Sequence, residues 1–86
     1  MRQQNFRAIV RLEHYLEHVA ATQGTVAVAE GEALRARLTY YQIARAIGIT
    51  YKECVRLFKQ LQSGVNYQRG GKITVTDWQR LGEMKE

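Results

Sequence analysis

Apolar residues recur at helical spacing over the first quarter of the chain. Four aliphatic side chains fall on one face of a helix predicted over residues 6–22: Ile9, Leu12, Leu16 and Val19. Four polar residues are expected on the opposite, solvent-facing side: Glu13, His14, Glu17 and His18. Gly24 follows as a helix stop, so the pattern predicts one helix with a single buried face.

Two short runs rich in Val, Ala and Leu come next, at residues 25–29 and 34–38. Glu30-Gly31-Glu32 separates them and has the composition of a tight turn. This pattern predicts a small β-hairpin, although alanine is a poor strand former.

Two capping boxes then begin eleven residues apart, at Thr39-Tyr40-Tyr41-Gln42 and Thr50-Tyr51-Lys52-Glu53. In each, the Thr hydroxyl and the Gln or Glu side chain satisfy backbone N–H groups that a helix start leaves unpaired. The first helix ends near Gly48, and we interpret Ala44 and Gly48 as small residues where two helices pack closely. Two capped helices joined by a short turn that contains Gly predict a helix-turn-helix over about residues 39–62.

Strand-forming residues 65–67 and 73–76 flank Arg69-Gly70-Gly71-Lys72. The paired glycines supply the positive φ of a tight turn, which predicts a β-wing over about residues 65–76. Thr76-Asp77 can cap a last short helix that packs Trp78 and Leu81 on the core. The predicted fold is therefore α+β, a small winged helix-turn-helix domain with an N-terminal helix, a short hairpin, the helix-turn-helix, a β-wing and a short C-terminal helix.

The composition fits one domain over residues 1–86, because 45% hydrophobic residues in 86 support a modest core. One cysteine, Cys54, excludes a disulfide framework and any Cys-only metal site. Neither a signal peptide nor an apolar run of membrane-spanning length is present, so we expect a cytoplasmic protein with no membrane partner.

The basic charge is concentrated in the middle of the chain. The net charge is +5, yet residues 35–72 contain eight Lys or Arg and a single acid, Glu53, for a net charge of +7. The segments on either side each carry a net charge of −1. Such a block indicates binding to a polyanion such as nucleic acid.

The second predicted helix of the helix-turn-helix has two unlike faces. Its core face is Cys54, Leu57, Phe58 and Leu61, and its opposite face carries Lys52, Arg56 and Lys59 with Val55 at the edge. Because an α-helix fits the major groove of double-stranded DNA, we expect four residues to read bases: Tyr51, Lys52, Val55 and Arg56. Five are expected at phosphates: Thr39, Thr50, Lys59, Arg69 and Lys72. Arg35, Arg37 and Arg45 are either further phosphate contacts or merely solvated.

At these residues the chain resembles a known family. The runs LTYYQIARAIGITYKECVRLFKQL and RGGKITVTDWQRL are similar to the C-terminal DNA-binding domain of the cyclic-AMP receptor protein and fumarate–nitrate reduction regulator superfamily. The resemblance implies the DNA-reading domain of a bacterial transcription regulator, with RNA polymerase as a further partner. Thr50 and Arg56 match the family's recognition helix, whereas Lys52 stands where Glu is expected, which changes the expected target sequence.

The superfamily's effector-binding barrel and long dimerisation helix have no counterpart in this sequence, which is therefore expected to be either an excised domain or a naturally solitary one. We therefore expect no sensor domain and no cofactor, and a dimer forming only through a missing segment or on DNA.

Two other functions fit parts of the sequence less well. His14, Glu17 and His18 match the H-x-x-E-H pattern of a zinc-peptidase class, but they face solvent and no third ligand follows, so we expect no metal site, no catalytic residue and no enzyme. Cys54 is expected to be buried and inert. The alternative function is a winged-helix protein–protein interaction module, which should carry an apolar patch where this chain has Lys52, Arg56 and Lys59.

Overall fold

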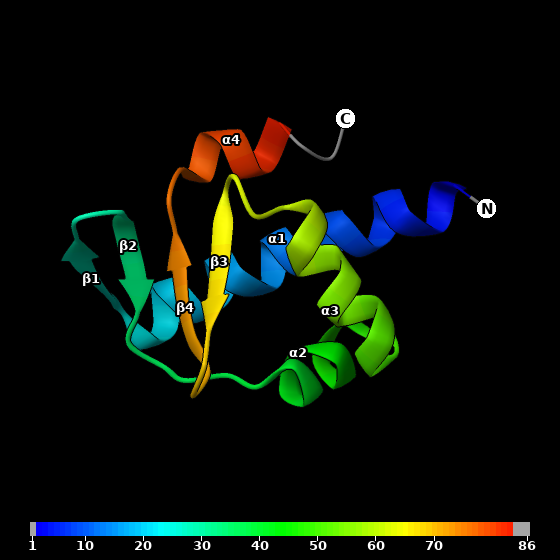
Figure 1. The fold of residues 1–86 in the computed structure, drawn as a ribbon, viewed down its shortest axis with the longest axis horizontal. Helices are drawn as coiled ribbons and strands as arrows, with labels where there is room; N and C mark the ends of the chain where they lie inside the picture. Colours follow the sequence, from blue (N-terminus) through cyan, green and yellow to red (C-terminus); the bar gives the residue numbers. More distant parts are fainter. Residues whose placement is uncertain (1, 84–86) are drawn as a thin grey trace.

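Four helices and four strands alternate along the chain. The computed structural model describes the backbone of residues 2–83 and the side chains of residues 8–83, and residues 1 and 84–86 lie outside the described part. The elements are α1 (Arg2–Gln23), β1 (Thr25–Val28), β2 (Gly31–Leu34), α2 (Tyr40–Ile47), α3 (Tyr51–Gln60), β3 (Val65–Gln68), β4 (Lys72–Val75) and α4 (Trp78–Glu83). The predicted α+β winged helix-turn-helix architecture is confirmed (Figure 1).

One antiparallel sheet joins the N-terminal hairpin to the wing. Its strand order is β1-β2-β4-β3, so β2 pairs with β4, a strand from the second half of the sequence. Helix α1 packs against α2, β2 and α4, and α2 packs against α3. The hairpin of β1 and β2 therefore forms one edge of the sheet, and the helix-turn-helix lies beyond the opposite edge (Figure 1).

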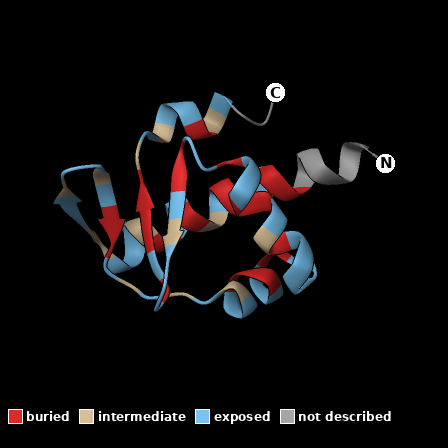
Figure 2. Ribbon diagram, in the orientation of Figure 1, coloured by how far each residue is buried: buried red, intermediate tan, exposed pale blue. Residues whose placement is uncertain are grey.

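The core forms where the predicted apolar faces meet. Leu12 and Leu16 of α1 are fully buried, as are Ile43 of α2, Cys54 of α3 and Ile73 of β4. Figure 2 shows the buried segments gathered where α1, α3 and the sheet face one another. Full burial of a Leu or Ile side chain stabilises the fold by about 1.5–3 kcal/mol. These side chains therefore hold the back of α3 in place and leave its other side exposed.

The hairpin turn differs from the prediction. Val28 pairs with Gly31, so the turn is the two residues Ala29-Glu30 rather than residues 30–32. The second strand, predicted over residues 34–38, is instead β2 (Gly31–Leu34), and residues 35–38 form no strand. The backbone N–H of Leu38 instead donates to the Gly71 carbonyl at 3.0 Å, which ties this segment to the wing tip. Tertiary pairing with the wing thus overrode the local apolar pattern.

Gly48 is needed for backbone geometry and not, as predicted, for close helix packing. It caps α2 in the left-handed region with φ of 77°, and its N–H donates to the Ala44 carbonyl at 2.8 Å. A Cβ placed on Gly48 would meet no atom within 4 Å. Ala44 is buried, in agreement with its predicted packing role.

Glu13 was predicted to face solvent, and this was wrong. Its side chain is 6% exposed because α4 folds over this side of α1. The approach is close, since a Cβ on Gly82 would lie 2.9 Å from Glu13 Oε2. His14, Glu17 and His18 are exposed, as predicted.

The last helix is anchored as expected. Asp77 Oδ1 accepts hydrogen bonds from the backbone N–H groups of Gln79 at 3.0 Å and Arg80 at 3.3 Å. Leu81 is fully buried, and the half-buried Trp78 donates from Nε1 to Glu32 Oε1 at 2.9 Å. Helix α4 therefore closes the core between α1 and the sheet.

Candidate nucleic-acid interface

Both predicted capping boxes are formed. The Glu53 N–H donates to Thr50 Oγ1 at 3.1 Å, and the Thr50 N–H donates to Glu53 Oε1 at 3.0 Å. Thr39 and Gln42 make the same reciprocal pair, at 3.1 and 2.8 Å. The boxes fix the first residue of each helix, so they also fix where Tyr51 is presented. Because the Thr50 hydroxyl also donates to Glu53 Oε1, at 3.2 Å, it already has both partners within the cap.

Replacing Thr50 by Ala should destabilise the protein by about 1 kcal/mol, because it removes the acceptor for an unpaired N–H at the start of α3. Urea unfolding followed by far-UV circular dichroism measures the change. Thr50→Ser keeps the hydroxyl and serves as the matched control, with stability close to the parent. An Ala variant as stable as the Ser variant would show that the cap contributes nothing.

The exposed side of α3 brings five predicted contact residues together. Lys52, Arg56 and Lys59 are exposed, Val55 is half-buried, and Tyr51 is 48% exposed. These five residues, which we call the groove face of α3, line one shallow depression. Cys54, Leu57 and Phe58 are buried on the opposite side of the helix, as the angular pattern predicted.

The positive charge of the groove face is not neutralised by its surroundings. Within the described part of the chain, no ion pair engages Lys52, Arg56 or Lys59. Glu53 is the acid of α3, and its carboxylate is held by the N-cap of its own helix. The groove face therefore presents three cations to an incoming anion.

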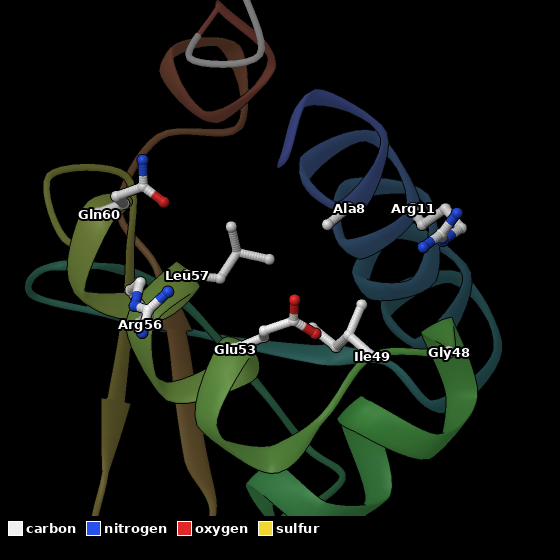
Figure 3. Close-up of a pocket in the computed structure, with 8 residues that line it drawn as sticks. All are labelled: Ala8, Arg11, Gly48, Ile49, Glu53, Arg56, Leu57 and Gln60. Atoms are coloured by element: carbon white, nitrogen blue, oxygen red, sulfur yellow. The ribbon is translucent and has the colours of Figure 1, made fainter. Parts of the chain in front are cut away.

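A small pocket lies beside the groove face, between α3 and α1. In Figure 3, Glu53 and Arg56 line the pocket from α3, and Arg11 lies on α1 at its other side. Arg11 Nε donates to the Ile47 carbonyl at 2.8 Å, so this guanidinium closes the C-terminal end of α2. The pocket holds about 120 Å³, well below the several hundred Å³ typical of small-molecule sites. It is therefore a packing feature at the border of the groove face.

The wing tip forms a second cationic point, separate from the groove face. Gly70 and Gly71 have φ of 88° and 83°, which confirms the predicted turn, and Arg69 and Lys72 are exposed beside them. Arg37 also reaches the tip, because its Nη1 would lie 3.3 Å from a Cβ on Gly70. The loop that precedes α2 thus adds a third cation to the wing.

A group of aromatic rings joins the wing to the helix-turn-helix. Tyr40 of α2 stacks on Tyr67 of β3 with ring centroids 3.8 Å apart and planes at 17°. Both rings meet Phe58 of α3 edge-on, at 5.5 and 5.8 Å. The pKa of the Tyr40 phenol is raised above its usual range, mainly by burial and to a smaller extent by the neighbouring Tyr67. The phenol therefore stays neutral. These contacts fix the wing relative to α3.

Tyr41 lies next to the groove face of α3, and it was not singled out from the sequence. It is 68% exposed and stacks on Tyr51, with centroids 5.3 Å apart and planes at 25°. The available signal was the position of both tyrosines directly after helix starts that carry the same capping box.

No reactive group accompanies this surface. Cys54 is buried as predicted, and burial raises the pKa of its thiol to about 11, so it stays protonated at neutral pH. Among the described residues, no group of three or more His, Cys, Asp and Glu is arranged to hold a metal ion. No described helix has both the length and the apolar character to span a bilayer.

Comparisons with known proteins agree with this geometry. The family described as Crp-like helix-turn-helix domain matches residues 10–84. A CooA mutant from Carboxydothermus hydrogenoformans superposes with a TM-score of 0.77 at 22% identity, covering 92% of this chain and 37% of CooA. Oxidized CprK in complex with o-chlorophenolacetic acid gives 0.74 at 15% identity, covering 99% of this chain and 36% of CprK.

The imidazole-bound form of the CO-dependent transcription factor CooA, also from Carboxydothermus hydrogenoformans, gives a TM-score of 0.71 at 23% identity and covers 92% of this chain. This chain therefore spans little more than a third of the solved proteins that it resembles. A comparison with curated proteins gives no significant match.

Proposed function

The chain belongs to the family of Crp-like helix-turn-helix domains, the DNA-binding domains of transcription regulators, and we propose that its helix α3 enters the major groove of double-stranded DNA. The wing between β3 and β4 rests on the sugar-phosphate backbone next to it. In this proposal Tyr51, Lys52, Val55 and Arg56 contact bases, while Thr39, Thr50, Lys59, Arg69 and Lys72 contact phosphates. The domain binds and reads DNA and performs no chemistry on it.

One observation carries the proposal, namely the two-sided character of α3. Its back is fixed in the core by Cys54, Leu57 and Phe58, and its front presents cations that form no ion pair with any residue the structure describes. Arg and Lys donate to guanine O6 and N7 in the major groove, where their charge is also favoured by the phosphates. A rigid helix with this front can therefore hold a fixed register on a duplex.

The threonines fit this role through their backbone more than through their hydroxyls. Thr50 Oγ1 is engaged by Glu53, and Thr39 Oγ1 by Gln42, within the capping boxes. A phosphate near these helix starts would be favoured by the dipoles of α2 and α3. We propose that Thr39 and Thr50 position the helix ends beside phosphates.

Selection from a pool of random duplexes at about 0.1 M salt tests the proposal. We expect enrichment of one short motif that contains guanine at the positions read by Lys52 and Arg56, since both side chains are donors. Lys52 has no acceptor for cytosine N4, unlike the Glu that the family resemblance places there. A pool that remains random after several rounds would refute sequence-specific binding.

Replacing Arg69 and Lys72 together by Ala should weaken binding to all duplexes alike. A hairpin tip brings charge to phosphates without reading bases, so the slope of log K against log salt should fall by about 1–2. Titrations of the selected and a scrambled duplex at several salt concentrations measure both effects. A loss confined to the selected duplex would indicate base contact by the wing instead.

The same proposal includes two protein partners, a second copy of the domain and RNA polymerase. Two such domains pair on half-sites about one helical turn apart when they are held as a dimer or bind DNA together. RNA polymerase is the partner through which a bound regulator would act, and the compartment is the cytoplasm. Sedimentation of the free domain, followed by titration of half-sites and full sites, separates a preformed dimer from pairing on DNA.

A further inference from the structure

Three large hydrophobic side chains of the described residues are exposed, and two of them lie together. Tyr41 and Tyr51 are 68% and 48% exposed and stack on each other, whereas Val26 is 41% exposed on the far strand β1. We call Tyr41 and Tyr51 the tyrosine pair. Its members are the second residue of α2 and the first residue of α3, so the pair joins the starts of both helices.

Ring contacts hold the tyrosine pair in place before any partner binds. Tyr51 meets the ring of Tyr40 edge-on at 5.9 Å and 75°, and Tyr40 stacks on Tyr67 of the wing. The offset stack between Tyr41 and Tyr51 is itself a favoured ring geometry. Little side-chain entropy is therefore lost when the pair meets a ligand, which favours a binding role.

The position of Tyr51 points to the floor of the major groove, and Tyr41 of α2 stacks on this ring. The N-terminal residues of a recognition helix are those that contact base edges, and Tyr51 is the first residue of α3. Val55 follows one turn later and lines the same depression as Tyr51. Tyr51 and Val55 thus form an apolar border beside Lys52, Arg56 and Lys59. Tyr41 extends this border from α2 through its stack on Tyr51.

The single apolar group that bases present in the major groove is the thymine C5-methyl. We propose that the tyrosine pair, together with Val55, reads thymine by contact with this methyl group, beside the guanine contacts of Arg56 and Lys52. This inference rests on the proposed DNA binding and adds a second kind of base discrimination to it. The phenolic hydroxyl groups are not needed for this contact, because the ring alone can pack against a methyl group.

Single uracil substitutions in the selected duplex test this inference. Uracil pairs with adenine as thymine does and differs by the missing methyl, so all hydrogen-bonding edges are kept. We expect uracil at one or two positions to weaken binding by the parent about fourfold each, the equivalent of about 0.8 kcal/mol for a buried methyl group. In Tyr41→Ala the uracil penalty should vanish at one of these positions, because the methyl group there no longer has the ring as a contact. The side-chain and methyl deletions together make a double-mutant cycle that measures this contact.

Three controls accompany the cycle. Tyr41→Phe keeps the ring and should keep the full uracil penalty. Val26→Ala removes another exposed apolar side chain, at the sheet edge, and should bind both duplexes as the parent does. Circular dichroism of Tyr41→Ala verifies folding, which this exposed position should tolerate.

Two outcomes would overturn the inference while leaving the proposed function intact. The first is a selected motif to which uracil duplexes bind as well as thymine duplexes at every position. The second is a uracil penalty of the same size in Tyr41→Ala and the parent at every position. Failure of the selection itself would instead refute DNA reading altogether.

Discussion

Arg56→Ala should weaken binding to the selected duplex by about 1–3 kcal/mol, which is roughly 5- to 150-fold, and relax the preference at one base pair. Arg56 is exposed in the middle of α3, opposite the buried Leu57 and Cys54, so its guanidinium points into the proposed groove. A bidentate contact to guanine is lost with it, and Ala cannot replace either donor. Titration against the selected duplex and its single-base variants measures both effects.

Arg80→Ala is the matched control for the loss of one charge. Arg80 is exposed on α4, at the opposite end of the fold from the starts of α2 and α3 (Figure 1). Its removal should change affinity little and leave the base preference unchanged. If Arg56→Ala bound the selected duplex as tightly as Arg80→Ala, Arg56 would lie outside the groove.

Gly31→Ala should destabilise the protein by about 2–5 kcal/mol, the largest stability effect that we expect. A Cβ at this position would lie 2.3 Å from the Val75 carbonyl oxygen and 2.8 Å from Thr76 Cα, both backbone atoms of the strand β4 and its end. The backbone φ of 150° is also unfavourable for a residue with a side chain. Overpacking against backbone costs about 1–3 kcal/mol, and the strained φ adds about 1–2.

Gly48→Ala separates these two contributions. Gly48 also has a positive φ, of 77°, but a Cβ there meets no atom within 4 Å. This variant should therefore lose about 1–2 kcal/mol from backbone strain alone. Thermal unfolding distinguishes the two, because each kcal/mol shifts Tm by about 4–8 °C in a domain of this size. Equal losses in both variants would mean that the β2–β4 approach is not tight.

Local signals in the sequence predicted most of the helix-turn-helix and the wing. The capping boxes at Thr39 and Thr50 mark helix starts because their hydrogen bonds span three residues and depend on nothing distant. The paired glycines of the wing mark the turn for the same reason. The two faces of α3 follow from helical spacing, which likewise needs no knowledge of neighbours.

Features that depend on distant segments could not be predicted in this way. Glu13 is buried because α4, some 65 residues later in the chain, folds over it. The turn at Ala29-Glu30 is set by a register that also pairs β2 with β4. The stacking of Tyr41 on Tyr51 depends on the angle between α2 and α3, which packing of Ala44 and its neighbours decides. The assignment of individual DNA contacts stays a prediction until binding is measured.

The two faces of α3 also bear on how such a domain acquires new targets. Residues that hold the fold and residues proposed to read DNA lie on opposite sides of one helix, and Lys52, Arg56 and Lys59 are exposed. Substitutions at exposed positions of this kind usually change stability by less than about 0.5 kcal/mol. Binding preference can therefore drift through a series of folded intermediates, so evolution or a designed library can exchange the reading residues on an unchanged scaffold.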